Sequence, residues 1–299
     1  MKASRSRFLD IRGLRYHLRT WGDEDAPLLV MLHGWMDVSA SFQFVVDALA
    51  GDWHVAAPDW RGFGRSERTR SDSYWFPDYL ADLDRLLDAL SPEAPVRLLG
   101  HSMGGNVAML YAGVRPTRVR ALLNLEGFGL REGAPTEAAA RYARWLDELR
   151  AGASLRDYAS LDEVAARLMK NNPRLTPQRA QFLAPYWSEP DGAGRLRIAG
   201  DPAHRIVNPV LYRWTEAAAC WRQIAAPVLW VEGAATDALR WAGARAEVDA
   251  RRALLRDCTA ASIADAGHML HHDQPHAVAA TIEAFLQARG HAHVDERAP

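Results

Sequence analysis

A short segment at residues 100–104, GHSMG, carries the residues with the clearest chemical potential in the chain. It matches the pattern G-x-S-x-G and lies between an apolar run and a helical pattern, the setting that a sharp strand-to-helix turn requires. Such a turn lifts the Ser102 hydroxyl to the carboxyl end of a sheet. It also places the hydroxyl at a helix N-terminus, whose positive end favours a developing negative charge. The segment therefore predicts a serine nucleophile.

A serine hydroxyl is a poor nucleophile at pH 7 and needs a general base. His101 is adjacent to Ser102, but successive side chains on a tight turn point in different directions, so it is kept only as a candidate pocket residue. His268 directly follows an expected strand, in a loop that can reach back over Ser102. His271 and His272 lie further on, where we expect them to begin the last helix or to face solvent. We predict His268 as the base.

The histidine in turn needs a carboxylate that fixes its tautomer and stabilises the imidazolium. Asp237 is one candidate, because it follows the apolar run PVLWVEG. Glu126 is the other, because it ends the apolar run ALLNLE about two dozen residues after Ser102. A carboxylate at the end of a buried strand is costly unless it has a partner, and either His268 or a buried arginine could be that partner. Both acids stay open, as does the possibility that they act together.

These residues must be positioned by the elements around them, and short apolar runs alternate with helical patterns along most of the chain. The N-terminal residues predict a β-hairpin that turns at Gly13. The further expected strands are 28–32, 53–57, 96–100, 121–126, 228–232 and 261–265, and the expected helices include 77–90, 103–114 and 274–288. Near-continuous apolar strands between helices predict an α/β fold with a parallel sheet covered on both faces.

The alternation stops between about Arg131 and Thr215, where no strand is expected. Helices are predicted within 136–149, 160–169 and 176–187, the last two with Ser160 and Thr176 as N-caps. The segment is rich in aromatic side chains: Tyr142, Trp145, Tyr158, Tyr186, Trp187, Tyr212 and Trp214. They could cover a pocket, with Trp145 and Trp187 as its candidate residues, or fill the segment's own core. We expect core domain residues 1–130 and 216–290, a helical cap at 131–215 and a flexible tail at 291–299.

Four motifs together resemble the α/β-hydrolase superfamily: HGW at 33–35, DWRGFGRS at 59–66, GHSMGG at 100–105 and AGHMLHHDQP at 266–275. Within it the chain is most similar to the serine-hydrolase-like branch related to haloalkane dehalogenases, but with a serine nucleophile. The resemblance implies a mostly parallel eight-stranded sheet, helices on both faces and a helical cap after the sixth strand. It also implies an oxyanion hole built from the backbone N–H groups of Trp35 and Met103, and a structural role for His33.

The resemblance also bears on the choice of acid. The pattern common in the family places an aspartate three residues after the glycine that ends the seventh strand. Three residues after Gly233 is Thr236, so Asp237 is one residue late. Some haloalkane dehalogenases draw their acid from the end of the sixth strand, which is the place of Glu126.

The nucleophile type indicates the reaction. Dehalogenases and epoxide hydrolases use an aspartate at this turn, whereas serine suits attack on a carbonyl and an acyl-enzyme. We therefore expect a carboxylesterase that cleaves a small to medium apolar ester in a largely enclosed pocket. A C–C bond hydrolase, lactonase or thioesterase with the same triad is the alternative, and a non-catalytic ligand-binding protein is the third.

No metal or organic cofactor is expected. The triplet HHD at 271–273 lacks a convincing metal-ligand spacing, and His291 and His293 lie on the polar tail. The segment DWRGFGRSE has neither G-x-G-x-x-G nor a Walker lysine, so Arg61 and Arg65 are interpreted as scaffold rather than phosphate ligands.

Composition limits the remaining classes. The chain has 299 residues, 24% of them charged, with a net charge of −1, which gives no electrostatic footprint for nucleic acid or an anionic membrane. No apolar run approaches the roughly 18 residues that span a bilayer, and the N-terminus has no apolar stretch of a signal peptide. Cys220 and Cys258 are the two cysteines, which favours a reducing compartment. We expect a cytoplasmic monomer or homodimer that acts on a small molecule.

Overall fold

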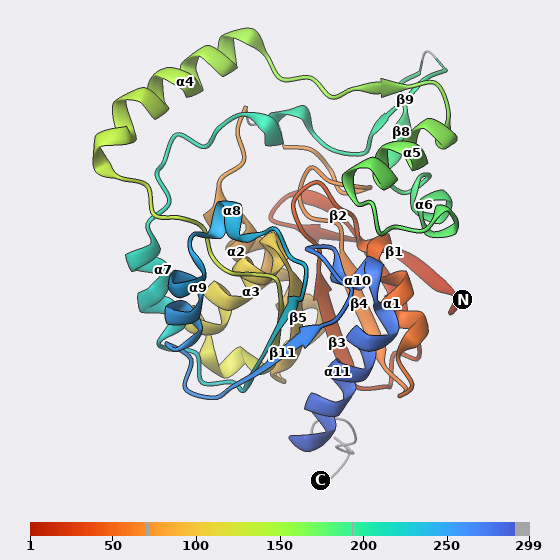
Figure 1. The fold of residues 1–299 in the computed structure, drawn as a ribbon. Coiled ribbons are helices and arrows are strands. Elements are labelled where there is room, and N and C mark those ends of the chain that lie inside the picture. The colour runs from red at the N-terminus through yellow and green to blue at the C-terminus, as the bar shows by residue number, and fades with distance from the viewer. Residues whose placement is uncertain (70–71, 193, 291–299) are drawn as a thin grey trace.

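The computed structural model describes residues 1–69, 72–192 and 194–290. The expected tail at 291–299, with His291 and His293, lies outside the described residues. One sheet has the strand order β1-β2-β4-β3-β5-β6-β10-β11 (Figure 1). Its strands are β1 (Ser4–Ile11), β2 (Leu14–Trp21), β3 (Leu28–Leu32), β4 (His54–Pro58), β5 (Val96–His101), β6 (Val119–Leu125), β10 (Val228–Gly233) and β11 (Cys258–Ile263).

The sheet is mostly parallel, as expected. All neighbours from β4 to β11 pair in parallel, while the hairpin β1–β2 and the pair β2–β4 are antiparallel. The hairpin turns at Arg12 and Gly13, with φ of 54° and 76°. Two successive positive φ values are typical of the tight turn that matches strand twist, and glycine adopts this backbone readily.

Successive strand residues pack on opposite faces of the sheet. Leu98 and Leu122 belong to one apolar core, while Leu99 and Leu123 belong to the other. This alternation explains why the central strands read as unbroken apolar runs. The first core is covered by α2 (Phe76–Leu90), α3 (Met103–Val114), α7 (Trp214–Trp221), α8 (Leu239–Ala242) and α9 (Arg245–Arg252), and the second by α1 (Gln43–Ala48), α10 (Leu270–Asp273) and α11 (Pro275–Ala288).

The segment between β6 and α7 contains helices α4 (Ala138–Ala151), α5 (Leu161–Asn171) and α6 (Pro177–Leu183). Ser160 and Thr176 cap α5 and α6, as predicted, by accepting hydrogen bonds from backbone N–H groups. The expectation that this segment holds no strand is wrong. A small antiparallel sheet of order β7-β9-β8 forms from β7 (Asp157–Tyr158), β8 (Ser188–Pro190) and β9 (Leu196–Ile198).

These three strands are two or three residues long, which is too short for an alternating pattern to show in the sequence. Short 3₁₀ turns complete the described elements: η1 (Ser39–Phe42), η2 (Pro116–Arg118), η3 (Pro135–Glu137) and η4 (Pro202–Arg205). Among the described residues, no helix is both long enough and apolar enough to cross a membrane.

A buried ion pair fixes the loop after β4 against helix α2. The Arg61 guanidinium donates to Asp82 at 2.5 and 2.6 Å, and the Tyr16 hydroxyl donates to the same carboxylate. Asp82 is fully buried, and Arg61 is also buried. This geometry agrees with the interpretation of Arg61 as scaffold.

We predict that Asp82→Ala lowers the free energy of unfolding by about 3–5 kcal/mol, because it removes the buried carboxylate of Arg61 and leaves only the longer contact with Asp78, at 3.3 Å. Chemical denaturation followed by circular dichroism measures the change. Asp88→Ala on the same helix is the matched control, since Asp88 pairs with Arg85 in an exposed ion pair that is worth less than about 1 kcal/mol. Equal effects of the two substitutions would contradict the prediction.

Candidate active site

Ser102 sits on the sharp turn between β5 and α3. Its φ of 53° and ψ of −116° are unusual for a residue with a side chain, and such strained backbone is concentrated at functional sites. A Cβ atom built on Gly100 would lie 2.3 Å from the Gly104 carbonyl oxygen, and one on Gly104 would lie 2.2 Å from the Leu32 carbonyl oxygen. Both positions therefore need glycine, because other backbone passes within contact distance.

Three side chains from distant parts of the sequence meet at this turn. The Nε2 atom of His268 is 2.9 Å from Ser102 Oγ, and its Nδ1 atom is 3.0 Å from Glu126 Oε2. His268 lies in the loop after β11, and Glu126 follows the last residue of β6. In the tautomer that allows Nε2 to accept the serine proton, Nδ1–H donates to Glu126. The arrangement is that of a nucleophile, a base and an orienting acid.

The Glu126 carboxylate is enclosed by hydrogen-bond donors. Its side chain has no exposed surface, and its backbone adopts a φ of 60°. Gly233 N–H donates to Oε1 at 2.7 Å, and the Thr236 hydroxyl donates to Oε2 at 2.5 Å. Burial raises the pKa of Glu126 to about 8, an effect that the hydrogen bonds from Thr236 and Gly233 oppose only in part. These donors and the adjacent His268 ring favour the ionised carboxylate, whereas burial favours the neutral acid.

Asp237, the rival acid, lies outside this arrangement. Its side chain is 59% exposed and pairs with Arg240 at 3.0 Å. Thr236 occupies the position at which the family pattern expects the acid, and its hydroxyl contacts Glu126 instead. The residue at the position of the family pattern is therefore a threonine that contacts Glu126, and Asp237, one residue later, faces solvent.

Burial makes His268 a neutral base at neutral pH. It lowers the pKa of His268 to about 4, an effect that the negative charge of Asp237 partly opposes. The charge of Asp237 thus raises the pKa of the imidazole, although its carboxylate pairs with Arg240 and not with the ring. The Trp241 ring packs edge-on against the imidazole, with centroids 5.0 Å apart. Trp241 was not singled out from the sequence, because nothing in its local pattern connects α8 with the loop after β11.

The HGW loop lies directly against the nucleophile. A Cβ atom on Gly34 would be 3.2 Å from Ser102 Cβ, so this glycine allows the loop to approach. His33 is fully buried and accepts a hydrogen bond from the Trp60 N–H at 2.9 Å, while the Trp60 indole donates to the His33 carbonyl oxygen. His33 thereby ties the HGW loop to the loop after β4. Trp35 follows with its side chain 54% exposed.

The histidines around His268 have different places from those expected. His101 is buried and hydrogen-bonds through Nε2 to the His268 backbone oxygen at 2.8 Å, so it holds the loop that carries His268. The expectation that His271 and His272 begin the last helix or face solvent is wrong. Neither residue belongs to the last helix, α11, and neither faces solvent. They belong to the short helix α10, and their side chains are buried, because α10 packs against η1 and α1.

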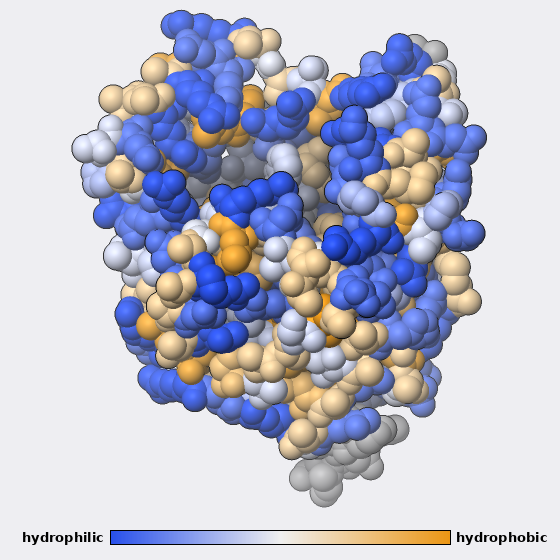
Figure 2. All heavy atoms as spheres, viewed as in Figure 1, coloured by the Kyte–Doolittle hydropathy of each residue, from blue (hydrophilic) through white to orange (hydrophobic). Residues whose placement is uncertain are grey.

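The molecular surface is hollowed between the side of the molecule that carries α4 and the side that carries α5 and α6 (Figure 2). Helix α4 has no buried residue, and its Trp145 is half-buried. Trp187 packs against the small core around Tyr158 and Leu183, and its indole N–H is 3.4 Å from Ser41 Oγ. Trp187 therefore contributes both to the core of this segment and to its contact with the sheet domain, whereas Tyr142 on α4 is exposed.

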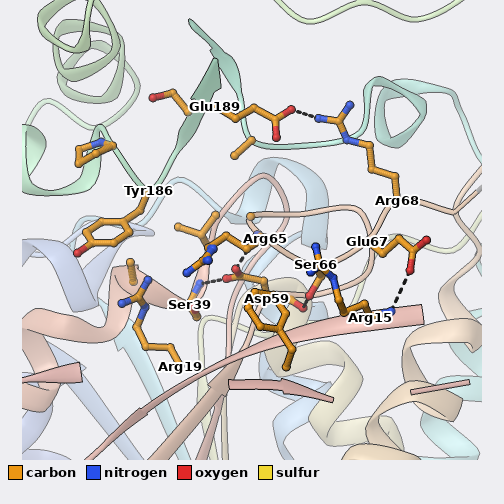
Figure 3. Close-up of a pocket in the computed structure, with 17 residues that line it drawn as sticks. Arg15, Arg19, Ser39, Asp59, Arg65, Ser66, Glu67, Arg68, Tyr186 and Glu189 are labelled. Atoms are coloured by element: carbon orange, nitrogen blue, oxygen red, sulfur yellow. Dashed lines mark hydrogen bonds and ion pairs between the residues drawn. The ribbon is translucent and has the colours of Figure 1, made fainter. Parts of the chain in front are cut away.

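A cavity of about 600 Å³ lies beside the N-terminal hairpin (Figure 3). Its opposite wall is formed by the residues that follow α6 and by β8. Its walls are strongly charged: Arg15, Arg19, Arg65 and Arg68 face Asp59, Glu67 and Glu189. Arg68 pairs with Glu189, joining the inserted segment to the loop after β4. The predicted pocket residues His101, Trp145 and Trp187 do not line this cavity, so it does not match the apolar pocket that the sequence suggested.

Known proteins are similar to this chain in parts of their sequence and in their fold. A serine hydrolase-like protein of Danio rerio is 32% identical over 180 residues, which are 55% of this chain and 52% of that protein. Epoxide hydrolase 4 of Mus musculus is 32% identical over 112 residues, 37% of this chain and 31% of that protein. The chain thus spans about half, or less, of the length of these curated relatives.

Among solved structures, a thioesterase domain from the curacin biosynthetic pathway superposes with a TM-score of 0.84. It is 25% identical, and the match covers 94% of this chain and 99% of that domain. The family model described as the alpha/beta hydrolase fold matches residues 27–275, which include Ser102, Glu126 and His268. The chain therefore belongs to the α/β-hydrolase family.

Proposed function

We propose that this hydrolase is a serine carboxylesterase in which Ser102, His268 and Glu126 form the catalytic triad. The observation that carries the proposal is the continuous hydrogen-bonded chain from Ser102 Oγ through the imidazole to Glu126. Serine at the strand-to-helix turn supports acyl transfer, because its alkoxide attacks carbonyl carbon. The similarity to proteins named serine hydrolase-like and thioesterase is consistent with that chemistry.

The first step forms an acyl-enzyme. His268 Nε2 takes the Ser102 proton as Oγ bonds to the carbonyl carbon of the ester, and the carbonyl oxygen becomes an oxyanion. The imidazolium then gives the same proton to the alcohol oxygen as the C–O bond breaks. Because His268 is neutral at pH 7, it is ready to accept that proton without first losing one.

Two backbone N–H groups are proposed to stabilise the oxyanion. Met103 N–H is the first of helix α3, where the amide groups of the first turn have no partner within the helix. Trp35 N–H belongs to the HGW loop, which Gly34 brings against Ser102. Hydrogen bonds from fixed N–H donors become stronger as negative charge develops on the carbonyl oxygen. This stabilisation of the transition state is usually the largest single contribution to catalysis.

Deacylation repeats these steps with water in place of serine. His268 removes a proton from water, the hydroxide attacks the acyl carbon, and Ser102 leaves with the proton returned by the imidazolium. Glu126 stabilises the imidazolium in both halves of the reaction. Thr236 and Gly233 hold the carboxylate so that Oε2 faces the ring throughout.

The substrate proposed is a small or medium apolar ester, and residues 131–215 are proposed as a cap over it. Trp35, Met103 and Trp241 supply apolar surface around the reacting atoms. Thioesters and lactones react through the same intermediates, so the triad alone does not separate them.

We predict that a fluorophosphonate probe labels Ser102 stoichiometrically, because the activated hydroxyl attacks phosphorus as it attacks carbonyl carbon. Intact-protein mass spectrometry counts the label and peptide mapping finds its site. Ser102→Ala should remove the label, while Ser160→Ala, which alters a helix cap, should retain it. An unlabelled wild-type protein under conditions that label ordinary serine esterases would defeat the proposal.

A panel of p-nitrophenyl esters, lactones and thioesters of matched acyl length then ranks substrates by kcat/KM. The ester proposal expects the p-nitrophenyl esters to rank first and short to medium acyl chains to be preferred. A preference for thioesters of at least tenfold in kcat/KM would move the assignment to a thioesterase with the same triad.

We predict that Glu126→Gln lowers kcat about 10³–10⁴-fold with little change in KM, because the carboxylate stabilises charge that appears only in the transition state. Asp237→Asn is the matched control and should keep kcat within about threefold, because the Asp237 side chain is exposed to solvent. Steady-state kinetics on one ester decide between them. Near-normal kcat in Glu126→Gln would assign the acid role to Asp237.

We predict that the acid limb of the kcat/KM profile lies below the ordinary histidine pKa of about 6.5. The sign follows from burial: it lowers the pKa of His268, so the neutral base persists as pH falls and activity is lost only when the ring is protonated. Asp237→Asn should move this limb further down, since the negative charge of Asp237 raises the pKa. An acid limb above pH 6.5 in a protein that stays folded by circular dichroism would contradict this reading.

A further inference from the structure

A second cluster of ionisable side chains lies buried beside the proposed triad. Asp37, His271 and His272 each turn one ligand atom toward a common point, and these atoms all lie within 4.8 Å of one another. Asp37 comes two residues after Trp35 in the loop after β3, and the two histidines lie on α10, just after His268. The proposed function does not use this cluster.

The polar atoms of this cluster are left without partners. Asp37 Oδ2, both ring nitrogens of His271 and the Nε2 atom of His272 are buried and make no hydrogen bond with the described residues. The approach of His271 Nε2 to Asp37 Oδ2, 3.6 Å, is too long for a hydrogen bond. Buried polar groups are almost always paired, so an unpaired ligand atom on each of these three side chains indicates that something else lies between them.

The types of side chain in the cluster suit a cation rather than an anion. A carboxylate oxygen and imidazole nitrogens without hydrogen-bond partners face one another in a buried space. Two imidazole nitrogens and one carboxylate oxygen are ligands that divalent transition metals such as Zn²⁺ prefer, whereas Ca²⁺ and Mg²⁺ prefer oxygen alone.

The carboxylate is already oriented for such a role. Asp37 Oδ1 accepts hydrogen bonds from the Val38 N–H at 2.8 Å and from the Ser41 hydroxyl, which leaves Oδ2 directed at the histidines. Metal-binding carboxylates are held in this way by partners outside the first coordination shell. The rings of Phe42 and Phe44 pack against His271 and His272, and they exclude water from this side.

We propose that Asp37, His271 and His272 bind one divalent transition-metal ion of the Zn²⁺ type. Ligand atoms about 2.0–2.1 Å from a tetrahedral ion lie about 3.3 Å apart, so no separation in the cluster needs to contract by more than roughly 1.5 Å. The gap between His271 and Asp37 is already close to that spacing.

An ion at this place would connect the loop after β3 with the segment that carries His268 and α10. One carries Trp35, whose N–H is proposed for the oxyanion, and the other carries His268. Binding therefore stabilises the folded state by mass action and holds the two loops in register. The metal site does not depend on the esterase proposal, because its ligands are distinct from the triad.

The test uses the whole chain, stripped with a chelator that is then removed. Isothermal titration with Zn²⁺ should show one site per chain, Co²⁺ should give visible absorption bands typical of a tetrahedral N/O site, and Zn²⁺ should raise the melting temperature. Asp37→Asn keeps the hydrogen bonds to Oδ1 but weakens the ligand, and His272→Gln removes another. Each should lower the affinity at least tenfold and abolish the thermal shift.

Two further variants locate the site. His54→Gln is the matched control, since His54 is also a buried histidine with an unpaired ring nitrogen but lies on β4, and it should bind Zn²⁺ like the wild type. His268→Gln should also retain binding. Absence of stoichiometric binding by the wild type would overturn the proposal, as would loss of binding in His268→Gln alone, which would place the ion at the triad. Zn²⁺ binding by the wild-type protein tests the proposal even if a variant of one of the ligand residues fails to fold.

Discussion

The Glu126 carboxylate is the interaction on which the arrangement of the site depends. A negative charge without exposed surface requires several donors, and here three donors come from the ends of two neighbouring strands. Gly233 ends β10, Thr236 lies in the following loop, and His268 lies in the loop after β11. Satisfying one carboxylate therefore brings the ends of three neighbouring parallel strands into a fixed relation. The imidazole receives its orientation as one part of that requirement.

This constraint also explains how an acid can stand at the end of β6. At the position where the family pattern expects an aspartate, Thr236 cannot supply a negative charge, but its hydroxyl can stabilise one supplied by a neighbouring strand. The ends of β6 and β10 are adjacent because these strands pair in parallel from Val228↔Leu122 to Val231↔Leu125. A short side chain from one strand and a longer one from the next can therefore place a carboxylate at the same point. The choice of Glu rather than Asp at position 126 fits the greater reach required.

Sequence patterns predicted those parts of the molecule that are governed by local rules. The run 28–32 matches β3, and the helical pattern 103–114 matches α3, since periodicity and the glycines of the turn determine both. Features that depend on tertiary contacts could not be predicted from the sequence. The strands β7, β8 and β9 are too short to leave a pattern, and the burial of His271 and His272 follows from the packing of α10 on α1 and η1 rather than from their neighbours in sequence. The sequence could narrow the acid only to two candidates, Glu126 and Asp237. It could not choose between them, because the pairing of β6 with β10 determines which carboxylate reaches the imidazole ring.

The same distinction applies to the metal-ligand question. The triplet at 271–273 was set aside because its spacing is unsuitable, and the structure shows that Asp273 points elsewhere, accepting hydrogen bonds from the Gly267 N–H and the Asn172 amide. The carboxylate that meets the two histidines is Asp37, more than two hundred residues earlier in the chain. Parallel strands gather their following loops at one edge of the sheet, so residues that are unrelated in sequence are placed around one point. At that edge Ser102, Glu126 and His268 hydrogen-bond to one another, whereas Asp37, His271 and His272 each leave a buried polar atom without a partner, and a cation is the simplest partner that satisfies all three.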